Sequence, residues 1–251
     1  MTLPQHLVPD LAGVAPGATV TVEGDEAHHA VVVRRLRQGE RLQLSDGRGR
    51  VVLGTIAATA KRTLDVTVEE VVDHPEPVPR ITVVQALPKG DRGELAVEVL
   101  TEIGVARIVP WAAERSVAVW KGERAAKSLA RWRSTAREAA KQSRRAWHPE
   151  VTPMAGTDEV VALLEAAEAG VVLHEDAATP LSEIALPPTP GTGAGIAIVV
   201  GPEGGLSDTE VARLAQAGGV PVRLGTEVLR TSTAGLAAAS ALLARTPRWG
   251  G

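Results

Sequence analysis

Polar and apolar residues alternate along roughly the first 72 residues of the chain. The alternating runs read ATVTVEG, RLQLSDG, RVVLGTIAAT and LDVTVEEVV, and glycine or aspartate separates several of them. A period of two with β-branched residues is typical of half-buried β-strands, and glycine and aspartate favour the turns between them. The pattern therefore predicts a small β-rich domain at the start of the chain.

A proline-rich segment, DHPEPVPR at 73–80, follows the last of these runs. Proline fixes φ and removes a hydrogen-bond donor, so the segment predicts a stiff linker and a domain boundary. We therefore expect one domain at 1–74 and a second domain at 80–251.

Beyond the linker, short apolar runs alternate with longer segments of helical period. We expect strands at 81–87, 106–111, 170–175, 196–201 and 220–225, and helices at 91–105, 122–143, 207–218 and 233–245. Such alternation predicts a mostly parallel α/β sheet, with ligands bound at the carboxyl ends of its strands.

Composition narrows the class of protein. The chain has 251 residues, is 44% hydrophobic and has no cysteine, which excludes disulfides and thiolate metal sites. No apolar run approaches the roughly 18–20 residues of a membrane span. The N-terminus, MTLPQHLVPD, lacks the basic and apolar regions of a secretory signal. We expect a cytoplasmic protein with no metal and no membrane partner.

Charge is distributed unevenly along the chain. The net charge is −3, yet residues 121–148 contain nine Lys or Arg and two Asp or Glu, a net +7 that leaves −10 elsewhere. A second basic cluster spans Arg34 to Arg50. Two basic patches on an acidic body are typical of a protein that binds a polyanion. A solvated helix face and a charged hairpin would produce the same pattern.

Three expected strand ends carry the candidate chemistry: LHE at 173–175, GPEGG at 201–205 and LGTEVLRTSTA at 224–234. Ser207 and Glu210 have the spacing of a capping box, which predicts a helix directly after GPEGG. The loop lacks the Lys of a P-loop and the spacing of a dinucleotide fingerprint. The charge of Glu203 would repel a phosphate. The loop therefore suits a ligand with a neutral or cationic portion, although an ordinary strand-to-helix turn could also look like this.

GPEGGLSDTE followed by LGTEVLRTSTAGLAAAS resembles the SPOUT superfamily of methyltransferases, and in particular the RsmE family, which methylates N3 of a uridine in small-subunit ribosomal RNA. HHAVVVRRLRQGE at 28–40 is similar to that family's N-terminal RNA-binding domain. KGDRGELAVEVLTEIGVARIVPWAAERSV at 89–117 and REAAKQSRRAWHPEV at 137–151 are similar to its central blocks.

The resemblance implies a PUA-like β-barrel at 1–74 and a SPOUT α/β domain with a deep trefoil knot at 80–251. It also implies a homodimer that binds S-adenosylmethionine and acts on 16S rRNA of the small ribosomal subunit. The residues then expected at the cofactor are Leu173, His174, Glu175, Val200, Gly201, Gly204, Leu224, Gly225, Val228, Leu229, Thr231 and Thr233.

Methyl transfer to the weakly acidic N3 needs a group that removes the proton or stabilises the anion. Arg230 stays protonated, so we expect it to stabilise developing negative charge at the uracil, with Glu203 as a base or a cation-stabilising group. The residues expected to contact RNA are Arg34, Arg35, Arg37, Lys89, Arg115, Gln142, Arg144 and Arg145.

Other classes of function remain open. They are a Rossmann-like nucleotide-dependent enzyme, a non-catalytic RNA-binding module, and a related methyltransferase acting on a ribose 2′-hydroxyl or guanine N1.

Overall fold

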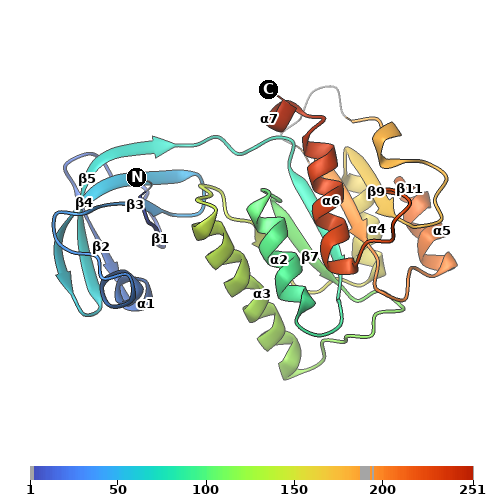
Figure 1. The fold of residues 1–251 in the computed structure, drawn as a ribbon, viewed down its shortest axis with the longest axis horizontal. Coiled ribbons are helices and arrows are strands. Elements are labelled where there is room, and N and C mark those ends of the chain that lie inside the picture. The colour runs from blue at the N-terminus through green and yellow to red at the C-terminus, as the bar shows by residue number, and fades with distance from the viewer. Residues whose placement is uncertain (1–2, 187–192, 194, 251) are drawn as a thin grey trace. The chain divides into compact units, whose positions relative to one another are not determined.

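The computed structural model describes residues 3–186, 193 and 195–250 and divides into two compact units. The first unit contains Met1–Glu76 and Lys141–His148, and the second contains Pro77–Ala140 and Pro149–Gly251. Figure 1 traces the chain through both units. Among the described residues, no helix is long and apolar enough to cross a membrane.

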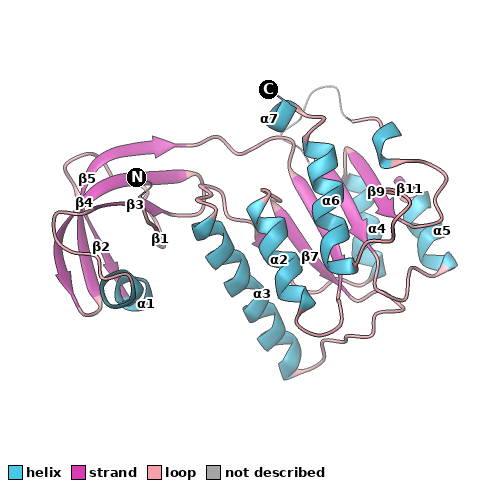
Figure 2. Cartoon of the chain, in the orientation of Figure 1, coloured by secondary structure: helices cyan, strands magenta, loops and turns pink. Residues whose placement is uncertain are grey.

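The first unit is built on a five-stranded sheet that curls around a small apolar core (Figure 2). The strand order is β1-β3-β4-β5-β2, with β1 parallel to β3 and the other pairs antiparallel. Alternate residues face the core, as Leu42 and Leu44 do on β3, which is the predicted period of two. The strands are β1 (Gln5–Leu7), β2 (Thr19–Glu23), β3 (Arg41–Ser45), β4 (Arg50–Ala60) and β5 (Thr63–Asp73).

The chain between β2 and β3 is helical, which the alternation did not predict. Helix α1 (Gly24–His28) continues into a wide π-helical turn, η1 (His29–Val33), and buries Ala27 and Ala30 in the core. Arg35 follows at a positive φ of 56°, which is strained for a residue with a side chain. The exposed arginines 34, 35 and 37 therefore lie on the loop that leaves this turn.

Residues 141–148 return to the first unit from the opposite half of the sequence. The indole of Trp147 lies against Gly49, where a Cβ would come within 2.6 Å of the ring. Its Nε1 donates a hydrogen bond of 2.9 Å to the carbonyl oxygen of His74. The Gly49 nitrogen bonds the Ala146 oxygen at 3.0 Å, and the His148 nitrogen bonds the Gly47 oxygen at 2.9 Å. These contacts place the segment in the first unit.

The second unit confirms the predicted parallel α/β sheet. Its order is β11-β9-β10-β6-β7-β8, and each neighbouring pair is parallel. All six residues of β6 are buried, as expected for a parallel strand covered on both faces. The strands are β6 (Ile81–Ala86), β7 (Arg107–Trp111), β8 (Glu150–Val151), β9 (Ala169–Leu173), β10 (Ile196–Val200) and β11 (Gly219–Val222).

Helices cover both faces of this sheet and enclose a separate core on each face. Helices α2, α3 and α6 contribute to one core, and α4 and α5 contribute to the other. The helices are α2 (Arg92–Glu102), α3 (Glu123–Gln142), α4 (Thr157–Ala166), α5 (Asp208–Gln216), α6 (Thr231–Leu243) and α7 (Pro247–Gly250), and η2 (Leu181–Glu183) is a single 3₁₀ turn.

The predicted helices are present, with ends that shift by a few residues. The first ends at Glu102, and Gly104, where the sequence predicts its end, lies two residues on with a φ of 95° in the turn that stops the helix. The last begins at Thr231 rather than at 233. Neither α4 nor β8 was predicted, although Val160 and Leu164 of α4 have helical spacing and are buried.

Candidate functional site

A cavity of about 810 Å³ lies at the carboxyl ends of β9, β10 and β11, where a parallel sheet is expected to bind ligands. The predicted strand ends meet in it. Glu203, Arg115 and Arg230 line the cavity. So do eleven of the twelve residues expected at the cofactor, which are Leu173, His174, Glu175, Val200, Gly201, Gly204, Leu224, Gly225, Val228, Leu229 and Thr231.

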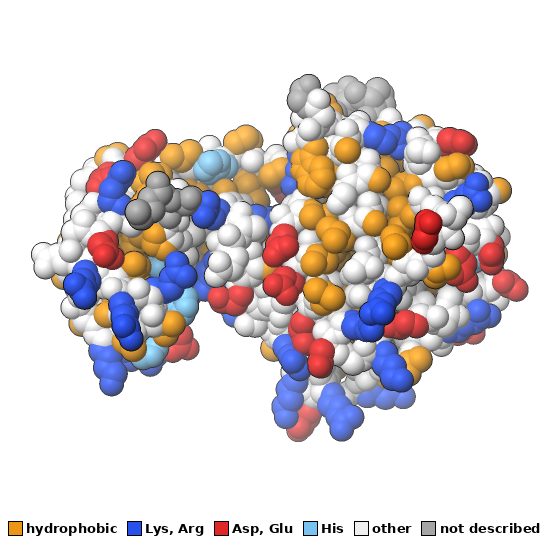
Figure 3. Space-filling model, viewed as in Figure 1, with side chains coloured by type: hydrophobic (Ala, Val, Ile, Leu, Met, Phe, Trp, Pro, Cys, Tyr) orange, Lys and Arg blue, Asp and Glu red, His pale blue; other side chains and the backbone are white. Residues whose placement is uncertain are grey.

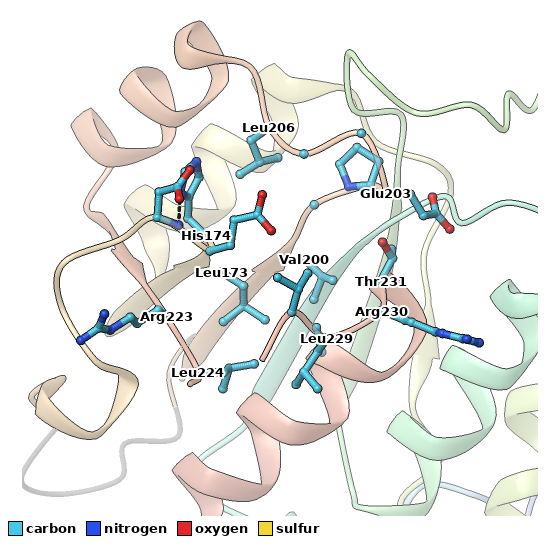
Figure 4. A pocket seen from close by; sticks show the side chains of 18 of the residues that line it. Leu173, His174, Val200, Glu203, Leu206, Arg223, Leu224, Leu229, Arg230 and Thr231 are labelled. Carbon is cyan, nitrogen blue, oxygen red and sulfur yellow. Dashed lines mark hydrogen bonds between the residues drawn. The ribbon is translucent and has the colours of Figure 1, made fainter. Parts of the chain in front are cut away.

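Four aliphatic side chains form an apolar centre in the cavity. Figure 4 shows Leu173, Val200, Leu224 and Leu229 facing one another, with polar groups arranged around them. Such a mixture is typical of a site that holds a flat apolar ring and orients it with a few polar contacts.

The loop after β10 is held by a buried carboxylate. Ser207 caps α5 and accepts a hydrogen bond of 3.1 Å from the Glu210 nitrogen, while Glu210 Oε2 accepts one of 3.1 Å from the Ser207 nitrogen. This confirms the predicted capping box. Glu210 is 3% exposed, and its other oxygen accepts a 2.8 Å bond from the Glu114 nitrogen. One side chain thus joins the loops that follow β10 and β7.

Arg115 reinforces the same junction. Its Nη1 donates hydrogen bonds to the carbonyl oxygens of Leu206, at 3.1 Å, and Gly204, at 3.5 Å. We expected Arg115 to contact RNA, and that role stays a prediction. The guanidinium also positions the glycine-rich loop, which the sequence analysis did not anticipate.

Glu203 lies on the outer side of this loop and is exposed. Its Oε1 accepts a 3.1 Å hydrogen bond from the backbone nitrogen of Lys89, in the segment that follows β6. Lys89 does not line the cavity. Figure 4 shows Glu203 and Arg230 on one side of the apolar centre, and His174 and Arg223 on the opposite side.

The loop before α6 is exposed from Gly225 to Arg230 and is anchored where the helix begins. Gln85, which is fully buried at the end of β6, donates a 3.2 Å hydrogen bond from Nε2 to the carbonyl oxygen of Thr231. Thr233 does not line the cavity. Its hydroxyl donates to the Arg230 oxygen at 3.3 Å, within the first turn of the helix.

His174 has one ring nitrogen already engaged. Nδ1 accepts a 3.2 Å hydrogen bond from the backbone nitrogen of Asp176, so the neutral ring carries its proton on Nε2. His174 can therefore offer one N–H donor at the cavity. Its role at the cofactor stays a prediction.

The cavity contains groups that the sequence analysis missed. Asp176, Asp208 and Glu227 add negative charge, and Arg92 and Arg223 add positive charge. Arg92 could have been found from the sequence, because it begins a helix directly after a buried strand of a parallel sheet. Across the described part of the chain, no three His, Asp or Glu side chains form a group that could hold a metal ion.

The other residues expected at RNA belong to the first unit: they are Arg34, Arg35, Arg37, Gln142, Arg144 and Arg145. Arg144, like Arg35, has a positive φ, at 53°. Strained arginines on loops are more common at functional sites than elsewhere. Their contact with RNA stays a prediction.

A buried charged cluster anchors residues 141–148 to the first unit. Lys141 Nζ lies 3.1 Å from both carboxylate oxygens of Glu26, and His6 Nδ1 lies 3.3 Å from Oε1. Burial alone would raise the pKa of Glu26. The hydrogen bonds from His6, Lys141 and the Leu7 nitrogen outweigh it and lower that pKa from 4.5 to about 2.

Comparisons with known proteins agree with this arrangement. Residues 74–243 match the family model of an RNA methyltransferase domain, and residues 22–69 match that of an RNA methyltransferase PUA domain. The ribosomal RNA small subunit methyltransferase E of Mycobacterium bovis is 44% identical over 93% of this chain and 89% of its own length. The enzyme of the same name from Bacillus subtilis is 32% identical over 89% of each chain.

Solved structures share the fold over nearly the whole chain. A ribosomal RNA small subunit methyltransferase E from Neisseria gonorrhoeae, bound to S-adenosylmethionine, has a TM-score of 0.85 and 30% identity over 97% of this chain and 98% of its own. A methyltransferase from Legionella pneumophila, also in complex with S-adenosylmethionine, has a TM-score of 0.86 and 29% identity over 98% of each chain.

Proposed function

The chain belongs to the RNA methyltransferase family that includes the ribosomal RNA small subunit methyltransferases E, and we propose that it methylates N3 of a uridine in 16S rRNA. It uses S-adenosylmethionine as the methyl donor. The observation that carries the proposal is the similarity to the named enzymes along the whole chain, combined with a cavity built from the GPEGG and LGTEVLRTSTA loops. Because the substrate is ribosomal RNA, we place the reaction in the cytoplasm.

The cavity fits the cofactor in size and chemistry. A volume of about 810 Å³ lies within the range of small-molecule sites. The apolar centre of Leu173, Val200, Leu224 and Leu229 suits an adenine ring, and the glycines of both loops let backbone groups approach it. The carboxylates around the cavity suit a cation. When bound, S-adenosylmethionine supplies an electrophilic methyl group.

Arg230 and Glu203 are proposed as the catalytic groups. The Arg230 guanidinium donates hydrogen bonds to the uracil carbonyl oxygens as N3 loses its proton, which stabilises the developing anion. Glu203, oriented by the Lys89 N–H, accepts that proton or balances the positive charge of the cofactor. Glu203→Gln lowers kcat in both roles, whereas only the loss of a base changes the pH dependence of kcat.

The chain is proposed to form a homodimer through an apolar surface over α2 and α6, which pack against each other. Leu95 of α2 is 44% exposed, and Val228 and Leu229, in the loop that leads into α6, are 75% and 41% exposed. Figure 3 shows hydrophobic side chains gathered over these helices. Leu95→Asp would place a charge in the interface and should release monomers in sedimentation. A monomeric wild-type chain would refute the dimer.

The trefoil knot of SPOUT enzymes is proposed for the C-terminal part of the second unit. The chain passes from β9 to β10 and then to β11, while α6 packs on β6 and β10. An electron-density trace through residues 196–243 would test the threading, because an unthreaded path would exclude the knot.

Transfer of a labelled methyl group from S-adenosylmethionine to unmodified small ribosomal subunits tests the function. The matched control is subunits already methylated by the active enzyme, which should accept no label. Mass spectrometry of the product nucleosides should show 3-methyluridine. A 2′-O-methyl nucleoside or 1-methylguanosine would overturn the assignment to N3.

The remaining classes of function give different results in the same experiments. Absence of transfer, together with RNA binding and no affinity for S-adenosylmethionine, would indicate a non-catalytic RNA-binding module. Thermal stabilisation by ATP or NAD, and none by S-adenosylmethionine, would indicate a nucleotide-dependent enzyme.

A further inference from the structure

Three of the four arginines that line the cavity lie on one side of β10, and the fourth, Arg223, lies on the β9 side. Glu175 and Asp176 follow β9, whereas Arg92 and Arg115 follow β6 and β7 on the other side of β10. Arg230 belongs to the second group, because Gln85 at the end of β6 holds the adjacent Thr231. A cationic cofactor is attracted to the β9 side. On the β6–β7 side the three arginines outnumber the carboxylate of Glu203, so this side favours an anionic ligand.

Arg92, like Arg230, is a cation of this group whose side chain has no partner among the described residues. Arg115 already donates to two carbonyl oxygens of the glycine-rich loop. Arg92 lines the cavity and is exposed, and no hydrogen bond or ion pair involves its side chain within the described chain. It is also the first residue of α2, where the helix dipole disfavours a positive charge. A locally unfavourable, unpaired arginine at a cavity is best explained by an anion that arrives with the substrate.

The positive charge continues from Arg92 onto the next helix. Strand β7 neighbours β6 in the sheet, and the segment after β7 leads to the start of α3. Lys121, Arg124 and Lys127 lie on this segment and the first turns of α3, are exposed, and take part in no ion pair among the described residues. We name Arg92, Lys121, Arg124 and Lys127 the basic rim. Figure 3 shows Lys and Arg side chains gathered over the start of α3.

We propose that the basic rim binds phosphates of the RNA strand that flank the target uridine, with Arg92 at the phosphate next to the cavity. This inference rests on the proposed function. Guanidinium groups match phosphate oxygens in charge and geometry. A base can reach the cavity only if its nucleotide is turned out of a helix, so its backbone must pass close to the cavity mouth. Contacts of this kind position the strand without reading its sequence.

The test compares Arg92→Gln and the pair Arg124→Gln/Lys127→Gln with Arg107→Gln. Arg107 is a matched control. It lies at the amino end of β7, opposite the cavity, and among the described residues its side chain forms an exposed ion pair with Glu150 alone. Three quantities are measured: kcat/KM for small subunits, the slope of log K for RNA against log salt, and the Kd for S-adenosylmethionine.

Arg92→Gln should lower kcat/KM for RNA about tenfold, as expected for one lost charged hydrogen bond. It should reduce the salt slope by about one, because one phosphate contact is lost. The double variant should reduce the slope by about two, and Arg107→Gln should change neither quantity. The Kd for S-adenosylmethionine should stay at the wild-type value in all variants.

If Arg92→Gln left kcat/KM and the salt slope unchanged, as Arg107→Gln should, the inference would be overturned. Methyl transfer by the wild-type chain would still support the proposed function. A weaker Kd for S-adenosylmethionine in Arg92→Gln would also overturn it, because the anion would then be the cofactor's carboxylate. A wild-type chain that transfers no methyl group to RNA would overturn both proposals.

Discussion

Glu26, His6 and Lys141 form a buried cluster whose disruption should detach residues 141–148 from the first unit. We expect Glu26→Gln to remove a negative charge that lies 3.1 Å from the Nζ of Lys141, a side chain that is only 9% exposed. The pKa of Glu26 is lowered from 4.5 to about 2, and such a difference corresponds to about 3 kcal/mol of unfolding free energy at pH 7. Breaking a buried ion pair by removing one partner costs a similar amount.

The pH dependence has a defined sign. The folded pKa of Glu26 lies below its unfolded value, so its stabilisation is present above pH 4.5 and is lost as the pH falls towards 2. The free energy of unfolding of the wild type should therefore exceed that of Glu26→Gln by about 3 kcal/mol at pH 7, and roughly half of that difference should be gone at pH 3.

The assay is urea unfolding of the full chain, followed by the indole NMR signal of Trp147, whose N–H bonds the His74 oxygen. The other four tryptophans lie in the second unit and report its unfolding separately. Glu70→Gln, an exposed change on β5, is the matched control and should leave the Trp147 transition unchanged. The prediction would be refuted if both variants changed the unfolding free energy at the Trp147 transition equally at pH 7. It would also be refuted if Glu26→Gln lowered that free energy by the same amount at pH 7 and at pH 3.

Three further changes test the site and the RNA contacts. Arg230→Ala should lower kcat by a factor of about 10² to 10³ with little change in cofactor affinity. Arg230→Lys should have the same low kcat, because the point charge of lysine lacks the guanidinium fork. Full kcat in either variant would exclude the electrostatic role. Neutralising Arg34 and Arg37 should raise KM for RNA and reduce the salt slope while calorimetry shows unchanged cofactor binding; impaired cofactor binding would contradict this division of labour. Gln85→Leu should lower the free energy of unfolding by about 1 kcal/mol and weaken the binding of S-adenosylmethionine, because the side-chain hydrogen bond that ties β6 to the first turn of α6 is lost. An unchanged Kd would show that this contact does not shape the cavity.

Much of the second unit was predictable because its signals are local. The apolar run of β6, the capping box at Ser207 and Glu210, and the glycine that ends α2 each depend on a few neighbouring residues. Strand and helix alternation then restricts the sheet to a parallel arrangement with its ligand site at the carboxyl ends. The residues around the cavity followed from the quoted loops and from the family that they resemble.

The parts of the fold and of the site that were not predicted depend on contacts between residues that are far apart in the sequence. Gln85 reaches Thr231 across 146 positions, and Lys141 reaches Glu26 across 115. No periodicity encodes such a pair, because either side chain could equally face solvent. The helical segment after β2 was missed for a related reason: its short apolar face becomes stable only when Ala27 and Ala30 pack into the core of the curled sheet.

The sequence by itself determined most strands, most helices, the family and the loops that make the cavity, because these are properties of short segments. Only the tertiary structure showed that Arg115 and Glu210 hold the glycine-rich loop and that Arg92 stands at the cavity with no side-chain partner among the described residues. The function of a charged side chain depends on the partners that folding brings to it, and here those partners come from loops that follow other strands of the sheet.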